Sequence, residues 1–122
     1  MKRLIVDIDN TISFKKASED YIDAKPDLMI REKLNSYFDD GFEIIFFTSR
    51  NMRTYKSNIG KINIHTLPGI LQFLEKYKFR YTEVLVGKPW CGTEGYYVDD
   101  KAIRPDEFKN LSYDEIIKVL NK

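Results

Sequence analysis

The sequence contains a single cysteine, Cys91, and a single histidine, His65. One cysteine cannot form a disulfide within the chain, which is typical of proteins that work in a reducing compartment. One cysteine and one distant histidine also fall short of the ligand set of a zinc site. We therefore expect a cytoplasmic protein whose chemistry is carried by other side chains.

Long apolar runs and an excess of charge of one sign are also missing. No hydrophobic stretch approaches the roughly 20 residues of a membrane span, and the N-terminus leads into a strand rather than a signal-peptide core. The formal net charge is +1, with 20 lysines and arginines against 19 acids. The sequence thus predicts a protein that inserts into no membrane and binds no nucleic acid through bulk charge.

With 122 residues, of which 43% are hydrophobic, the chain can build one compact domain spanning residues 1–122. The continuous apolar run at 3–8 predicts a strand buried on both faces. Residues 10–25 suggest a loop or small flap, and Gly60 with three asparagines argues against a long helix in 50–65. Further strands are predicted at 42–47, 83–86 and 96–98, and helices are predicted to begin near Pro26, at Thr66 and at Ser112.

Buried strands that alternate with helices predict an α/β fold, a three-layer, Rossmann-like parallel sheet flanked by helices. Right-handed crossovers place the carboxyl ends of parallel strands along one edge of the sheet. Ligands of such sheets bind at that edge. The residues that follow each predicted strand are therefore the candidates for function.

Two carboxylates, Asp7 and Asp9, close the first strand. Residues two apart on a strand point to the same side, and two neighbouring anions are costly unless a cation or a proton lies between them. The alternative interpretation is a strand followed by an ordinary acidic turn. The other strand ends decide between the two.

Each later strand end also carries a polar group, namely Thr48, then Lys88, then Asp99 with Asp100. Singly, these could be a turn threonine, a solvated loop lysine and a helix cap. Together they form a set suited to phosphoryl transfer, in which paired acids hold Mg²⁺, a carboxylate acts as nucleophile and a lysine neutralises charge.

Here the sequence resembles a known family. Asp7-x-Asp9-Asn10-Thr11, Thr48, Lys88 and Asp99-Asp100 resemble the four motifs of the haloacid dehalogenase (HAD) superfamily. Five further strings are similar to the small capsule-biosynthesis phosphatases of that superfamily. They are Ser49–Tyr55, Gly60–Asn63, Thr66–Pro68, Gly87–Gly92 and Tyr97–Pro105.

The resemblance implies a role for each matching residue. Asp7 would be the nucleophile, and Asp9 would be the general acid and then the base. Mg²⁺ would be held by the Asp7 carboxylate, the Asp9 main-chain carbonyl and Asp99, with Asp100 orienting the ligands. Thr48 and Lys88 would contact the phosphoryl group. Substrate contacts are expected from Asn10, Ser49, Arg50 and Asn51.

Larger relatives insert a cap domain, for which neither the interval from Asp9 to Thr48 nor that from Thr48 to Lys88 leaves room. We therefore expect a capless phosphatase for a small phosphomonoester, a sugar or polyol precursor of a capsule or surface polysaccharide. The flap or a second subunit could cover the site. Open alternatives are a macromolecular substrate, a non-catalytic relative that binds phosphate or Mg²⁺, and a phosphoacceptor receiver domain. Further side chains that could select the leaving group are Arg53, Lys61, His65, Trp90 and Tyr96.

Overall fold

The computed structural model describes residues 1–122, which form two compact units, Met1–Trp90 and Cys91–Lys122. Each unit is described by itself, and the prediction of a single domain over the whole chain stays a prediction. None of the helices combines the length and the apolar character needed to cross a membrane.

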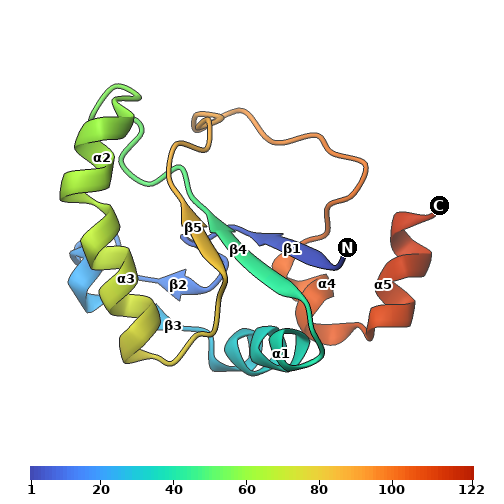
Figure 1. The fold of residues 1–122 in the computed structure, drawn as a ribbon. Helices are drawn as coiled ribbons and strands as arrows, with labels where there is room; N and C mark the ends of the chain where they lie inside the picture. The colour runs from blue at the N-terminus through green and yellow to red at the C-terminus, as the bar shows by residue number, and fades with distance from the viewer. The chain divides into compact units, whose positions relative to one another are not determined.

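The first unit is built on a three-stranded parallel sheet of β1 (Arg3–Val6), β4 (Glu43–Phe47) and β5 (Glu83–Leu85). The strand order is β1-β4-β5, so β4 lies in the middle (Figure 1). Leu4 pairs with Ile44, and Phe46 pairs with Val84. The predicted α/β class with a parallel sheet is confirmed at this level, and three of the four predicted strands are present.

Helices connect these strands. The first crossover is α1 (Leu28–Asp39), which begins where the Asp27 carboxylate accepts a hydrogen bond from the Ile30 amide at 3.1 Å. It ends before Gly41, whose φ of +96° suits a residue without a Cβ. The second crossover contains α2 (Ile59–His65) and α3 (Leu67–Lys76). The predicted starts near Pro26 and at Thr66 are therefore confirmed.

The sequence did not predict α2, because Gly60 and Asn63 lower helix propensity within it. The Asn58 side chain accepts a hydrogen bond from the Lys61 amide at 3.1 Å and caps this helix. Residues 51–57 form turns, and no long helix spans 50–65, as predicted. Thr66 precedes α3 as predicted, but its side chain makes no cap bond there.

The first crossover is tied to the second by Asn35 on α1. Its amide nitrogen donates to the Lys78 carbonyl at 3.0 Å, and its oxygen accepts from the Arg80 amide at 2.9 Å. Arg31 of the same helix donates to the Tyr77 carbonyl at 3.2 Å. The turn after α3 is thereby fixed to α1.

One face of the sheet is packed more completely than the other. Ile44 and Phe46 are fully buried, and the Phe46 ring meets the edge of Phe79 at 6.0 Å between centroids. On the opposite face, Ile5 is 57% and Leu85 is 44% exposed. The prediction that the first strand is buried on both faces is wrong. Successive right-handed crossovers that advance in one direction place their helices on the same face.

The segment from Thr11 to Lys25, here called the flap, leaves the sheet directly after the acids. It contains β2 (Ser13–Phe14), paired antiparallel with β3 (Lys25–Pro26), and the short 3₁₀ helix η1 (Tyr21–Asp23). Ile12 is fully buried at its base, whereas Ile22 is 85% exposed at its tip. The predicted flap is therefore an anchored hairpin with an exposed tip.

The second unit contains α4 (Pro105–Asn110) and α5 (Tyr113–Leu120). The predicted helix start at Ser112 is confirmed, and a capping box forms there, since the Ser112 hydroxyl accepts from the Glu115 amide at 3.2 Å. The predicted strand at 96–98 is wrong, because these residues join no sheet and Val98 is 89% exposed. A short run of aromatic and β-branched residues fits strand propensity without supplying a partner strand.

Candidate active site

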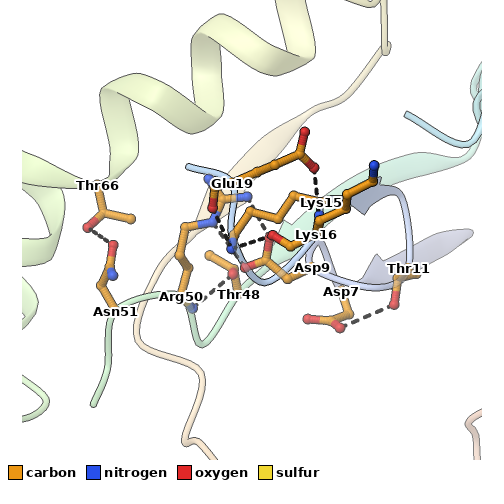
Figure 2. A network of polar contacts seen from close by, with 10 residues as sticks. All are labelled: Asp7, Asp9, Thr11, Lys15, Lys16, Glu19, Thr48, Arg50, Asn51 and Thr66. Atoms are coloured by element: carbon orange, nitrogen blue, oxygen red, sulfur yellow. Dashed lines mark hydrogen bonds and ion pairs between the residues drawn. The ribbon is translucent and has the colours of Figure 1, made fainter. Parts of the chain in front are cut away.

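Asp7 follows β1 and lies between two partners from different parts of the chain. The Thr11 hydroxyl donates to Asp7 Oδ2 at 3.2 Å, and Lys88 Nζ lies 3.7 Å from Asp7 Oδ1. The side chains of Asp7 and Lys88 are 36% and 21% exposed. A lysine from the end of β5 therefore provides the counter-charge that the acid pair requires (Asp7 and Thr11 in Figure 2).

A tight turn after β1 brings Thr11 back to Asp7. The main-chain oxygen of Ile8 accepts hydrogen bonds from the amides of Thr11, Ile12 and Ser13 at 3.1, 2.9 and 3.1 Å. Asn10 has a φ of +62°, a conformation that asparagine tolerates better than most residues. The side chain that the sequence places beside the site is thus also a turn former, and its predicted contact with substrate stays a prediction.

Thr48 and Lys88 are held together by the main chain beyond the ends of β4 and β5. The Thr48 amide donates to the Leu85 carbonyl at 3.0 Å, and the Lys88 amide donates to the Thr48 carbonyl at 3.1 Å. Gly87, which directly precedes Lys88, has a φ of +87°. A Cβ on Gly87 would lie 2.5 Å from Cδ1 of Ile59. The turn that presents Lys88 therefore depends on glycine.

Asp9 is bound by Arg50 through two parallel hydrogen bonds. Arg50 Nε lies 3.0 Å from Asp9 Oδ2, and Arg50 Nη2 lies 2.7 Å from Asp9 Oδ1. The Arg50 side chain is only 5% exposed, against 31% for Asp9. Its own amide donates to Thr48 Oγ1 at 3.0 Å. Arg50, predicted as a substrate contact, thus uses its guanidinium on the second acid (Figure 2).

Tyr21 of the flap covers this ion pair. Its ring centroid lies 4.1 Å from Cζ of Arg50 and 5.1 Å from Nζ of Lys15. Burial raises the pKa of the Tyr21 phenol, the Asp9 carboxylate raises this pKa further, and Arg50 lowers it. The flap therefore contributes an aromatic side chain to the group that surrounds Asp9.

Asp7 and Asp9 offer oxygen atoms, the kind of ligand that a hard cation prefers. Because Arg50 engages the Asp9 carboxylate, the main-chain carbonyl is the group that Asp9 could offer to a metal ion. The chain has no cluster of three His, Cys, Asp or Glu side chains that could hold a metal. Mg²⁺ commonly takes one or two carboxylates and completes its shell with water and phosphate oxygens, so the Asp7 carboxylate and the Asp9 carbonyl are the groups here that could hold it.

Asn51, predicted to touch substrate, is tied to the second crossover. Its Oδ1 accepts from the Thr66 hydroxyl at 2.7 Å, and its Nδ2 donates to the Thr54 hydroxyl at 3.2 Å. In Figure 2, Asn51 and Thr66 lie on one side of Arg50 and Asp7 lies on the other. Ser49 is half-buried, and its carbonyl accepts from the Met52 amide at 3.0 Å. Both residues therefore shape the loop after β4.

The loops that follow β4 and β5 bring a cation and an aromatic ring together. Cζ of Arg53 lies 5.7 Å from the ring centroid of Trp90, which is 44% exposed. Nearby along the chain, the ring of His65 stacks on that of Tyr55 at 5.6 Å. Of the candidates for leaving-group contact, Arg53 and Trp90 are thus paired across the loops that follow β4 and β5.

Asp99 and Asp100 belong to the second unit, and Tyr96 of that unit is 81% exposed. Asp99 Oδ1 accepts a hydrogen bond from the Lys101 amide at 2.8 Å, which makes it part of a turn. Both acids are exposed. Their predicted roles at the metal stay predictions.

Two side-chain contacts at the site do not follow from the motif alone. Thr11 belongs to the Asp-x-Asp-x-Thr motif, and its spacing of four residues from Asp7 across a tight turn is the signal that places it on Asp7. Tyr21 lies 29 positions before Arg50, and nothing local in the sequence signals their stacking. Only the folding of the flap brings the two together.

Comparison with solved structures gives one near relative. A protein from Vibrio cholerae, solved as an MCSG target, is 50% identical, with 99% of this chain and 98% of that chain aligned at a TM-score of 0.94. This chain belongs to the same family as that protein. No family model and no curated protein matches the chain.

A distant likeness concerns the fold alone. A chain of a Pnkp1/Rnl/Hen1 complex superposes with a TM-score of 0.52 and 17% identity. The match covers 89% of this chain and 33% of that chain. At this identity the two share an arrangement of elements, and residue roles do not transfer.

Proposed function

We propose that this protein is a Mg²⁺-dependent phosphomonoesterase of the HAD superfamily, with Asp7 as its covalent nucleophile. The observation that carries the proposal is the 3.7 Å approach of Lys88 Nζ to the Asp7 carboxylate, beside Thr48. Three strand ends thereby meet where a phosphoryl group would react. The three-layer HAD arrangement and the motif roles are part of this proposal.

The proposed reaction has two steps. An Asp7 oxygen attacks phosphorus, the bond from phosphorus to the ester oxygen breaks, and Asp9 gives its proton to the leaving oxygen. Asp9 then accepts a proton from a water molecule, which attacks the aspartyl phosphate and releases inorganic phosphate with Asp7 restored. Each step moves one proton and exchanges one bond at phosphorus.

Charge stabilisation falls to residues that are already in place. The Lys88 ammonium would neutralise negative charge on the phosphoryl oxygens, and the Thr48 hydroxyl can donate to one of them because its oxygen already accepts from Arg50. Bound Mg²⁺ would polarise the phosphoryl group and shield Asp7 from it. Asp7, the Asp9 carbonyl and, by the resemblance, Asp99 would hold the ion.

We propose a small phosphorylated sugar or polyol as substrate, a precursor of a capsule or surface polysaccharide. The support is the resemblance of the motif strings, together with a flap and loops rather than an inserted domain between Asp9 and Lys88. Because no domain is inserted over the site, a second candidate is a macromolecular substrate, such as the phosphorylated end of a polynucleotide.

The test is phosphate release from a panel of sugar phosphates, polyol phosphates and an oligonucleotide with a terminal phosphate. We expect turnover of a small phosphomonoester with Mg²⁺ and its loss with EDTA. Turnover of the oligonucleotide alone would select the second candidate. Failure to hydrolyse any member in Mg²⁺ would refute the phosphatase.

Asp7→Asn provides the decisive variant. Loss of the nucleophile should abolish turnover, because an amide oxygen cannot form the aspartyl phosphate. Asp40→Asn is the matched control, since Asp40 is an exposed acid at the C-terminal end of α1. Equal activity of the two variants would contradict the proposed role of Asp7.

A further inference from the structure

Arg50 is fixed from three directions. Two of its nitrogens bind the Asp9 carboxylate, its amide binds Thr48 Oγ1, and the Tyr21 ring lies 4.1 Å from its guanidinium carbon. At 5% exposure the side chain faces inward. An arginine that selected a leaving group would have to present its nitrogens outward, to the substrate.

The two parallel hydrogen bonds define the orientation of the Asp9 carboxylate. A planar guanidinium that binds both oxygens of a carboxylate fixes its plane as well as its position. A lysine offers one point charge and cannot reproduce that fork. The ring of Tyr21 in turn restricts the plane of the guanidinium, which joins the flap to Asp9.

We infer that Arg50 is a positioning residue that aims the Asp9 carboxylate at the leaving group, and that Tyr21 of the flap holds Arg50 for this purpose. The inference rests on the proposed function, in which Asp9 carries the proton. Arg50 then affects chemistry through Asp9, and substrate affinity depends on it little.

Two substrates separate this role from direct phosphate binding. The leaving group of 4-nitrophenyl phosphate departs without a proton, whereas that of an alkyl phosphate requires one. For Arg50→Lys we expect the rate of the 4-nitrophenol burst to lie within about threefold of the wild-type rate. On an alkyl phosphate from the panel, we expect kcat to be about 100-fold lower than that of the wild type, at similar KM. Equal losses on both substrates, or a loss confined to KM, would overturn the inference.

Arg80→Lys is the matched control. Arg80 also pairs with an acid, Asp39, and stacks on an aromatic ring, that of Phe38 at 4.6 Å. It lies on the turn after α3 and is half exposed. Its substitution repeats the chemical change of Arg50→Lys away from Asp9, so both substrates should react as in the wild type.

Substitution of Tyr21 should disturb folding less than substitution of the buried Arg50, because Tyr21 is 41% exposed. Tyr21→Leu removes the ring and should lower alkyl phosphate turnover about tenfold, with the 4-nitrophenol burst preserved. Tyr21→Phe retains the ring and should restore the alkyl phosphate rate. Wild-type behaviour of Tyr21→Leu on the alkyl phosphate would remove Tyr21 from the inference.

A double-mutant cycle gives a readout that needs no turnover. The changes Asp9→Asn and Arg50→Lys should be coupled, with an interaction of about tenfold in the equilibrium constant of unfolding. Independent effects would overturn the inference whatever the enzyme does. Coupling in a protein that hydrolyses no phosphate ester would refute the proposed function instead, so the two failures are distinguishable.

Discussion

The main-chain amide of Lys88 donates a hydrogen bond to the main-chain carbonyl of Thr48 at 3.1 Å. This bond continues the pairing of β4 and β5 one step past the strands and fixes the start of the Lys88 side chain relative to Thr48. Lys88 Nζ then reaches Asp7 across β4. The site is thus positioned by the sheet rather than by a mobile loop.

Replacing Lys88 should damage catalysis and spare stability. We expect Lys88→Met to lower kcat/KM by about 100-fold, because one pre-placed charge on a transition state contributes that order of magnitude. The unfolding midpoint in urea should change little, since partly exposed pairs at 3.7 Å stabilise proteins weakly. Lys122→Met, at the exposed C-terminus, is the control. Full activity of Lys88→Met would contradict the assignment.

Gly87 and Gly41 form a natural comparison. Each has a positive φ, +87° and +96°, so alanine at either position should destabilise the protein by about 1–2 kcal/mol in urea unfolding. The Cβ at Gly87 would also meet Ile59, but this side chain is 42% exposed and can turn away. Only Gly87→Ala should lower activity, because only that turn presents Lys88. Equal activities would argue against a fixed turn.

The Tyr21 phenol should make stability depend on alkaline pH. Its pKa in the folded protein lies above the usual 10.0, so the contribution is complete below pH 10 and is lost as pH rises through the folded value. Above pH 10 the unfolded phenol ionises first, which favours unfolding. We expect the wild type to lose stability relative to Tyr21→Phe in this range, measured by thermal unfolding. Parallel curves for the two proteins would contradict the raised pKa.

Asn35 should be the most costly polar side chain of α1 to remove. Asn35→Ala leaves the Lys78 carbonyl and the Arg80 amide without their side-chain partner. A loss of about 1–3 kcal/mol in the free energy of unfolding is expected for two such bonds. Ser36→Ala, at the exposed neighbouring position, should cost less than 0.5 kcal/mol, roughly the range of surface substitutions. Similar values for both would contradict the bridging role.

The asymmetry of the acid pair predicts different metal affinities. In Asp9→Asn the main-chain carbonyl is kept, so titration calorimetry should show Mg²⁺ binding largely preserved while turnover falls. Asp7→Asn removes a carboxylate ligand and should weaken binding strongly. The resemblance predicts the same for Asp99→Asn. A loss of affinity in Asp9→Asn as complete as in Asp99→Asn would count against the carbonyl as the ligand.

The sheet could be predicted from sequence because its strands are short apolar runs ended by polar residues. Asp7, Thr48 and Lys88 follow β1, β4 and β5 as the parallel arrangement requires. The prediction of a strand at 96–98 was wrong although it used the same kind of signal as the correct ones. The composition of this segment fits a strand, but nothing local shows whether a neighbouring strand exists to pair with it. Helix α2 was missed because Gly60 and Asn63 weaken the local signal, while Ile62 is fully buried and packing determines the outcome.

The contacts among side chains could be predicted least. Asp9 and Arg50 are 41 positions apart, and the choice of Arg50 between Asp9 and a substrate depends on where the flap and Tyr21 close around it. Asn51 looked similar in sequence, yet its amide is used by Thr66. Such choices follow from three-dimensional packing, which a linear pattern does not encode.

Trp90 is the one tryptophan of the chain, two residues after Lys88. Its indole is partly exposed, and the Arg53 guanidinium lies over its ring. Excitation near 295 nm therefore selects a single fluorophore two residues from Lys88 of the proposed site. Any ligand that displaces Arg53 from the indole alters the polarity and quenching that this fluorophore experiences, so binding can be followed in the native protein with no dye attached.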